Sequence, residues 1–261
     1  MELQVDGRKV FAATGGKSFD PKLPTIVFIH GASFDHTVWG LQARWFAWHG
    51  RGVLAIDMPG HGRSDGPLLE TVPAMADWTI RLLDAAGVKQ AALAGHSMGA
   101  LVALDAAARF PDRVSKLALL GAAYPMRVND ELLASAKADE HLSKDLINSW
   151  GFGRAAQLGQ HRVPGLWMMR GGLRTLEQSG AGVLYNDLAA CNAWADGETR
   201  AEAVKCPTLF VLGERDMMTP LKAARSLAQK MKAEVVVLPK VGHIMMEEAP
   251  DETLDALRRF L

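Results

Sequence analysis

Residues 91–104 constrain the fold of this chain more than any other stretch. They read as a short apolar strand, a turn of the pattern Gly-x-Ser-x-Gly at residues 95–99, and a helix of small residues. A serine in such a turn takes a strained, positive-φ conformation that lifts its hydroxyl above the end of the strand. Gly95 and Gly99 leave room for strand and helix to approach each other. The stretch therefore predicts a strand–turn–helix unit with Ser97 as a candidate nucleophile.

The same five-residue pattern occurs again at residues 62–66. This copy follows Pro59 and Gly60 and precedes Pro67, so it lies in a turn-rich loop with no strand before it and no helix after it. We therefore expect Ser64 to hydrogen-bond within its own loop.

Buried strands and amphipathic helices alternate along most of the chain, after an Asp-Gly hairpin at residues 3–14. This alternation predicts a parallel sheet with right-handed crossovers and helices on both faces. Strands are expected at residues 25–29, 53–56, 91–94, 114–121, 208–212 and 235–238. Helices are expected at residues 37–49, 70–86, 98–110, 221–231 and 252–261.

The alternation stops between residues 124 and 204, where no convincing buried strand occurs. Helical patterning at 129–148 and 174–188 is instead interrupted by glycines. Such an insertion is typical of a helical cap over the strand ends. We expect residues 1–123 and 205–261 to form one core domain and residues 124–204 to form the cap.

Two further candidates directly follow predicted strands. Asp216 comes after the strand ending at Leu212, and His243 after the strand ending at Leu238. Ligands collect at the carboxyl ends of parallel strands, so both should lie near Ser97. A serine nucleophile needs a base and a group that orients the base, and the order Ser, Asp, His fits this arrangement. Glu214 is the remaining alternative for the acid.

Catalysis at a carbonyl also needs two backbone N–H groups to bind an oxyanion. Met98, which follows the serine, is expected to supply one. Ala32, after His30 and Gly31 at the end of another strand, is expected to supply the second, with Ser33 as the alternative donor.

Charge and cysteine usage narrow the setting of the protein. The 29 basic residues balance the 29 acidic ones and form no block of like charge, so neither nucleic acid nor an anionic membrane is favoured as a partner. No apolar run approaches the roughly 18 residues that span a bilayer. The charge balance instead favours a small, largely uncharged molecule as substrate. Cys191 and Cys206 form no Cys-x-x-Cys pair and the chain starts with charged residues, so we expect a reduced, cytoplasmic setting. The oligomeric state is left open.

Taken together, these segments resemble the α/β-hydrolase fold family, as a serine esterase-like member with a helical cap. The resemblance implies an α/β fold with an eight-stranded, mostly parallel sheet, a cap after the sixth strand, and no organic cofactor or metal. Serine at the turn argues against dehalogenases and epoxide hydrolases, which place Asp there. Ile244 stands where related carbon–carbon hydrolases often have Trp. The motifs that carry the resemblance are at residues 30–32, 57–64, 95–99, 213–220 and 242–250.

These residues predict a serine hydrolase that cleaves a small, largely apolar carboxylic ester through an acyl-enzyme, with water as second substrate. A lactonase, amidase or carbon–carbon hydrolase on the same residues is the alternative, as is a ligand receptor or regulator without turnover. Aromatic and methionine side chains in the cap and beside the acid and base suit an apolar substrate, or are ordinary core residues. The substrate-binding candidates are Ser33, Trp150, Trp167, Met168, Met217 and Ile244.

Overall fold

The computed structural model describes residues 1–160 and 166–261, so the part of the predicted cap at 161–165 lies outside the described residues. The sheet has eight strands in the order β1-β2-β4-β3-β5-β6-β7-β8. Both pairs that involve β2 are antiparallel, and every pair from β4 to β8 is parallel. The strands are β1 (Glu2–Val5), β2 (Arg8–Ala13), β3 (Thr25–Ile29), β4 (Gly52–Ile56), β5 (Ala91–His96), β6 (Val114–Leu120), β7 (Thr208–Gly213) and β8 (Glu234–Leu238).

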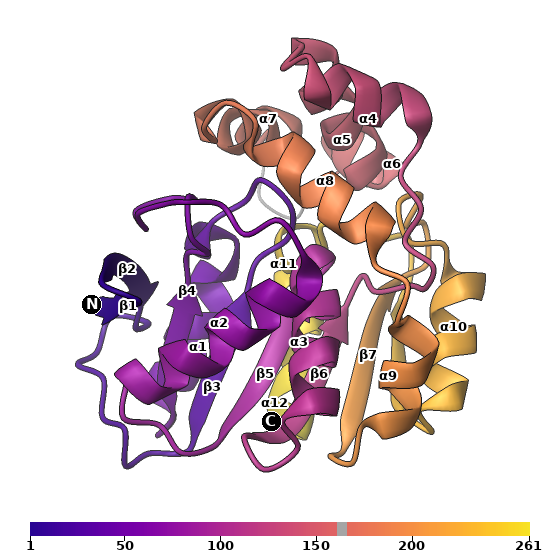
Figure 1. Cartoon of the computed structure of the whole chain (residues 1–261). Helices are drawn as coiled ribbons and strands as arrows, with labels where there is room; N and C mark the ends of the chain where they lie inside the picture. The colour runs from indigo at the N-terminus through magenta and orange to yellow at the C-terminus, as the bar shows by residue number, and fades with distance from the viewer. Residues whose placement is uncertain (161–165) are drawn as a thin grey trace.

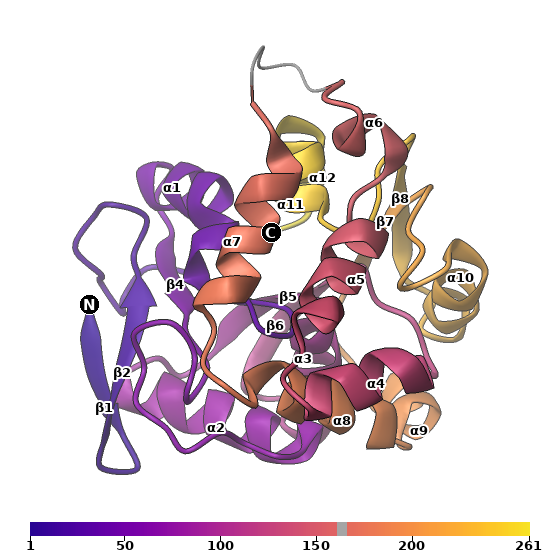
Figure 2. The same ribbon diagram turned by 90° about the horizontal axis from the view of Figure 1, so that it is seen from above.

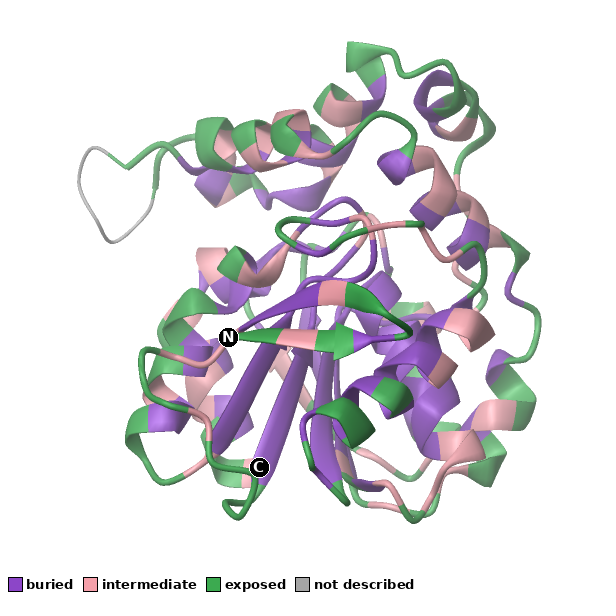
Figure 3. Cartoon of the chain, turned by 60° about the vertical axis from the view of Figure 1, so that its left-hand side comes forward, coloured by how far each residue is buried: buried purple, intermediate pink, exposed green. Residues whose placement is uncertain are grey.

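Helices cover both faces of this sheet (Figure 1). One face carries α2 (Val72–Ala85), α3 (Met98–Arg109), α9 (Gly197–Ala203) and α10 (Leu221–Lys230). The other carries α1 (Gly40–Trp48), with the short η1 (His36–Trp39) before it, α11 (Met245–Glu248) and α12 (Pro250–Phe260). All residues of β3, β4, β5 and β7 are buried between these layers, as Figure 3 shows. The apolar, partly β-branched runs in the sequence are therefore those of strands covered on both faces.

Among the described residues, five helices lie above the carboxyl ends of the strands: α4 (Asp130–Lys137), α5 (His141–Gly151), α6 (Arg154–Gln157), α7 (Met168–Gln178) and α8 (Val183–Ala193) (Figure 1). Seen from above, α7 and α5 stand on either side of the ends of β5 and β6 (Figure 2). Helix α9, which falls within the predicted cap range, packs beside α3 and α10. Its Arg200 pairs with Asp105 of α3 at 2.9 Å, and its Glu198 pairs with Lys230 of α10 at 2.8 Å.

The predicted hairpin, alternation and parallel sheet are confirmed, whereas the two helical stretches predicted within residues 124–204 are each divided. The stretch 129–148 breaks between α4 and α5, where Asp139 has φ 52°. A left-handed residue there ends α4 because it turns the next carbonyl and N–H out of the hydrogen-bonding ladder. The stretch 174–188 breaks between α7 and α8, where Ser179, the residue after α7, is extended at φ −67° and ψ 146°. In the described part of the chain, no helix is long and apolar enough to cross a membrane.

The tight β5–α3 connection gives a direct test of the fold. A Cβ on Gly95 would lie 2.1 Å from the carbonyl oxygen of Gly99, so Gly95→Ala should lower the free energy of unfolding by about 3 kcal/mol or more. The control is Gly40→Ala, at a helical glycine with no heavy atom within 4 Å of the added Cβ, which should be neutral or stabilise by up to about 1 kcal/mol. Urea denaturation measures both. Equal stability of the two variants would contradict the close approach.

Candidate active site

Ser97 occupies the single-residue turn between β5 and α3. Its φ is 53°, in the left-handed region that non-glycine residues rarely adopt. Its backbone N–H donates to the carbonyl of Leu120 on β6 at 2.9 Å, which holds the turn against the neighbouring strand. A Cβ on Gly99 would lie 2.4 Å from the carbonyl oxygen of Ile29, so α3 begins in contact with the end of β3. The strained serine is therefore fixed by the packing of three strands and a helix.

Asp216 and His243 meet beside this turn. The Nδ1 of His243 lies 2.7 Å from Oδ2 of Asp216, and both side chains are 2% exposed. Asp216 also accepts the backbone N–H groups of Met218 and Thr219, each at 2.8 Å, and the Thr219 hydroxyl at 2.6 Å. Burial alone would raise the pKa of Asp216, but the His243 ring and the Thr219 donors outweigh it and hold that pKa below its usual value. The carboxylate is therefore an ionised acceptor that keeps the proton of His243 on Nδ1.

The other nitrogen of His243, Nε2, is buried and has no hydrogen-bond partner among the described residues. It belongs to the same pocket as Ser97, although no hydrogen bond joins it to the serine hydroxyl in the described structure. The backbone of His243 is held by its N–H to Gly151 at 2.7 Å and by the Nε2–H of His96 to its carbonyl at 2.9 Å. The hydrogen bond between a catalytic base and its nucleophile often forms only when substrate binds. The arrangement leaves Nε2 available to take a proton.

The two expected oxyanion donors lie at the ends of neighbouring strands. Neither the backbone N–H of Ala32 nor that of Met98 has an acceptor among the described residues. The N–H of Ser33, the alternative donor, is already donated to Asp187 at 2.9 Å. The Gly31 carbonyl shares a peptide unit with the Ala32 N–H and accepts the Nδ1–H of His30 at 2.8 Å. Because C=O and N–H point in opposite directions in a trans peptide, this bond fixes the direction of the Ala32 N–H.

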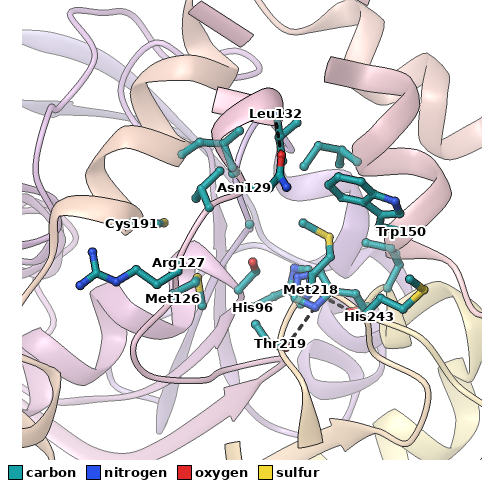
Figure 4. A pocket seen from close by; sticks show the side chains of 18 of the residues that line it. His96, Met126, Arg127, Asn129, Leu132, Trp150, Cys191, Met218, Thr219 and His243 are labelled. Carbon is teal, nitrogen blue, oxygen red and sulfur yellow. Dashed lines mark hydrogen bonds between the residues drawn. The ribbon is translucent and has the colours of Figure 1, made fainter. Parts of the chain in front are cut away.

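The pocket around Ser97 has a volume of about 150 Å³ and a mainly apolar lining. In Figure 4, His96, Met218, Thr219 and His243 gather on one side, with Asn129 and Leu132 across from them. Of the predicted binding residues, Trp150, Met217 and Ile244 line the pocket. The lining residues that the sequence did not single out are Phe34, Met126, Arg127, Val128, Asn129, Leu132, Ile147, Leu188, Cys191 and Thr219. Residues 126–129 follow β6, so their place after a strand was a usable signal.

The other three predicted binding residues lie outside this lining. Trp167 is 61% exposed. Met168 is buried beside a separate cavity between α6 and the end of β8. Ser33 donates its hydroxyl to Ser179, the residue after α7, at 2.6 Å. For Trp167 and Met168, apolar character alone did not distinguish pocket from non-pocket positions, because it does not tell which face of a helix meets the core.

Ser64 of the second Gly-x-Ser-x-Gly copy is buried, and its hydroxyl is hydrogen-bonded to the backbone. Its hydroxyl donates to the carbonyl of Asp57 at 2.7 Å and accepts the backbone N–H of Phe11 at 2.9 Å. It thus ties its loop to β2.

Among the described residues, Asp35, His36 and Asp57 bring potential metal-ligand atoms within 4.8 Å of one another. The carboxylate of Asp57 accepts the backbone N–H of His36 at 2.7 Å, its ring Nδ1–H at 2.8 Å, and the backbone N–H of Arg63 at 2.9 Å. Asp35 accepts from Thr37 and caps η1. These hydrogen bonds explain the cluster as a support for the loops after β3 and β4.

The profile of the Alpha/beta hydrolase family matches residues 26–256. The (E)-2-((N-methylformamido)methylene)succinate hydrolase of Acinetobacter baylyi is 25% identical over 90% of this chain and 89% of its own. The pimeloyl-[acyl-carrier protein] methyl ester esterase of Neisseria meningitidis serogroup B is 30% identical over 87% of this chain and 88% of its own. The crystal structure of the enol-lactonase from Burkholderia xenovorans LB400 has a TM-score of 0.88 at 23% identity, covering 100% of this chain and 99% of that one, which shows a shared fold.

Two glutamates follow the proposed base in α11. Glu248 accepts backbone N–H groups of Gly153, Gly242 and Ile244 at 2.9 to 3.2 Å, and so holds the loop that carries His243. Burial, together with the neighbouring carboxylate of Glu248, raises the pKa of Glu247 to about 7 from its ordinary 4.5.

This raised pKa predicts a pH-dependent stability. The folded chain keeps Glu247 protonated at a pH where the unfolded chain ionises it, so its contribution is fully present below pH 4.5 and is lost as pH rises through about 7. Glu247→Gln should have the wild-type Tm at pH 4.5 and a higher Tm at pH 8. The corresponding gain in the free energy of unfolding at pH 8 should be no more than about 3 kcal/mol. Thermal unfolding across this range, with exposed Glu202→Gln as control, measures the effect. A difference independent of pH would contradict it.

Proposed function

Because the chain belongs to the alpha/beta hydrolase family, we propose that it is a serine hydrolase of small, largely apolar carboxylic esters. One observation carries the proposal: a histidine oriented by a buried carboxylate presents to the pocket of the strained Ser97 an Nε2 that has no partner among residues 1–160 and 166–261. A serine hydroxyl is a weak nucleophile at neutral pH, and a base so placed is what activates it.

In the proposed reaction, His243 Nε2 takes the proton of Ser97 as the serine oxygen attacks the ester carbonyl. Asp216 stabilises the imidazolium that forms. The backbone N–H groups of Ala32 and Met98 bind the oxyanion of the tetrahedral intermediate, at the N-terminus of α3, where the helix dipole favours negative charge. His243 then gives its proton to the leaving alcohol. Water repeats the attack on the acyl-enzyme with the same base, which releases the acid and restores Ser97.

The pocket supports the proposed substrate class. Its lining is mostly aliphatic, aromatic and methionine side chains, and the helices α4 to α8 act as a cap above it. A volume of about 150 Å³ suits a short acyl or alcohol group. The relative named as a methyl ester esterase supports an ester over other acyl compounds.

The second Gly-x-Ser-x-Gly copy supplies a matched control for the nucleophile. Ser97→Ala should lower kcat on short p-nitrophenyl esters by at least about 10⁴-fold with the Tm preserved, because the base then has no hydroxyl to activate. Ser64→Ala should keep kcat per folded molecule within about threefold, since its hydroxyl only supports a loop. Steady-state kinetics on ester, lactone and amide panels measure both.

Retained turnover in Ser97→Ala would refute the proposed nucleophile. A lactone or amide preferred over every ester would replace the substrate class but keep the mechanism. A stoichiometric adduct without multiple turnover in the wild type would identify a receptor and refute an enzyme.

A further inference from the structure

Asp187 is a buried carboxylate that the proposed mechanism does not use. It lies on cap helix α8 and is fully buried. Its Oδ2 accepts the backbone N–H of Ser33 at 2.9 Å and the Nε2–H of His61 at 2.8 Å, and its Oδ1 accepts the Nδ2–H of Asn186 at 3.1 Å. A carboxylate in the interior is costly unless it is paired and hydrogen-bonded, and Asp187 is both.

His61 is the counterion of this carboxylate. Its Nδ1 faces the carbonyl of Pro59 at 3.1 Å while its Nε2 faces Asp187, so both ring nitrogens meet acceptors and both must donate. Burial alone would lower the pKa of His61, but Asp187 and the Pro59 carbonyl outweigh it and raise the pKa. Asp187 and His61 therefore form an ion pair that joins the cap to the loop after β4.

Ser33 is the residue on which this pair acts. Its φ of 61° lies in the left-handed region, which costs a non-glycine residue energy and persists only where neighbours hold it. The cap provides two hydrogen-bond acceptors for Ser33: Asp187 accepts its backbone N–H, and Ser179 accepts its hydroxyl at 2.6 Å. Ser33 directly follows Ala32, so the conformation of Ser33 sets the position of the peptide group that joins the two residues.

We propose that Asp187 is a positioning residue, through which the cap holds the loop of residues 31–33 in the conformation that aims the Ala32 N–H at the oxyanion. This inference rests on the proposed function. The loop is then fixed on both sides of Ala32: His30 holds the Gly31 carbonyl, and Asp187 holds the Ser33 N–H. The cap thereby takes part in building the site as well as in covering the pocket.

The test compares Asp187→Ala with Asp105→Ala. Asp105 is also fully buried and also joins cap-range helix α9 to the core, through Arg200 at 2.9 Å, but it does not contact the loop. Asp187→Ala should lower kcat about 10- to 100-fold with KM within threefold, because a displaced oxyanion donor weakens only transition-state binding. Asp105→Ala should lower the Tm and leave kcat per folded molecule within threefold. Asp187→Asn keeps an oxygen to accept the Ser33 N–H and should recover most of the activity.

Inhibitor binding separates positioning from a merely structural role. A trifluoromethyl ketone forms a tetrahedral adduct with Ser97, so its affinity should fall in Asp187→Ala by the same factor as kcat/KM. The affinity for the product acid should stay unchanged. Equal losses for both inhibitors, or a kcat equal to that of Asp105→Ala, would overturn the proposal.

A second variant keeps the test open if Asp187→Ala does not fold. Ser33→Gly removes the hydroxyl bond to Ser179 and lets the backbone at this position adopt other conformations besides the left-handed one. It should lower kcat and ketone affinity together by about 3- to 10-fold. An unchanged kcat in Ser33→Gly would overturn the proposal in that case. Loss of all turnover in Ser97→Ala with normal kinetics in the Asp187 and Ser33 variants would reject only the positioning role. Turnover retained in Ser97→Ala would reject the proposed function itself.

Discussion

The proposed site depends on one geometric constraint: the carboxyl ends of parallel strands meet at the same edge of a sheet. Ala32, Ser97, Asp216 and His243 follow β3, β5, β7 and β8 respectively, so four segments far apart in the sequence bring their groups to one place. The register of the parallel pairs fixes this meeting. A slip of one residue in a buried strand would reverse its two faces, so the packing that stabilises the core also holds the site together.

Strain at the site is balanced by contacts from outside it. Ser97 and Ser33 both have left-handed backbones, at φ 53° and 61°. The first is held by the carbonyl of Leu120 on the next strand, and the second by Asp187 of α8 and by Ser179, which follows α7. A turn that is held at several points keeps its N–H and hydroxyl groups directed without reorganisation, which is the condition under which backbone donors stabilise a developing charge.

The sequence predicts the sheet well, because each buried strand has a short apolar pattern of its own. Ser97, Asp216 and His243 could be proposed for the site because each follows such a strand. The sequence predicts the pocket poorly. Leu188 lines the pocket and Trp167 faces solvent, although both are apolar residues of the cap region. The hydrogen bonds from Asp187 to His61 and to Ser33 span 126 and 154 positions of the sequence, respectively. Such long-range contacts follow from how the cap sits on the sheet, which local periodicity does not determine.

The central claim is that Ser97 is activated by His243. Mass spectrometry of the protein treated with a fluorophosphonate tests it most directly, because this reagent traps a serine only where a base raises its nucleophilicity. We predict one phosphonyl group per chain, on the peptide that contains Ser97, and labelling slowed at least about 100-fold in His243→Ala. A label on any other residue, or an unchanged rate in His243→Ala, would contradict the account.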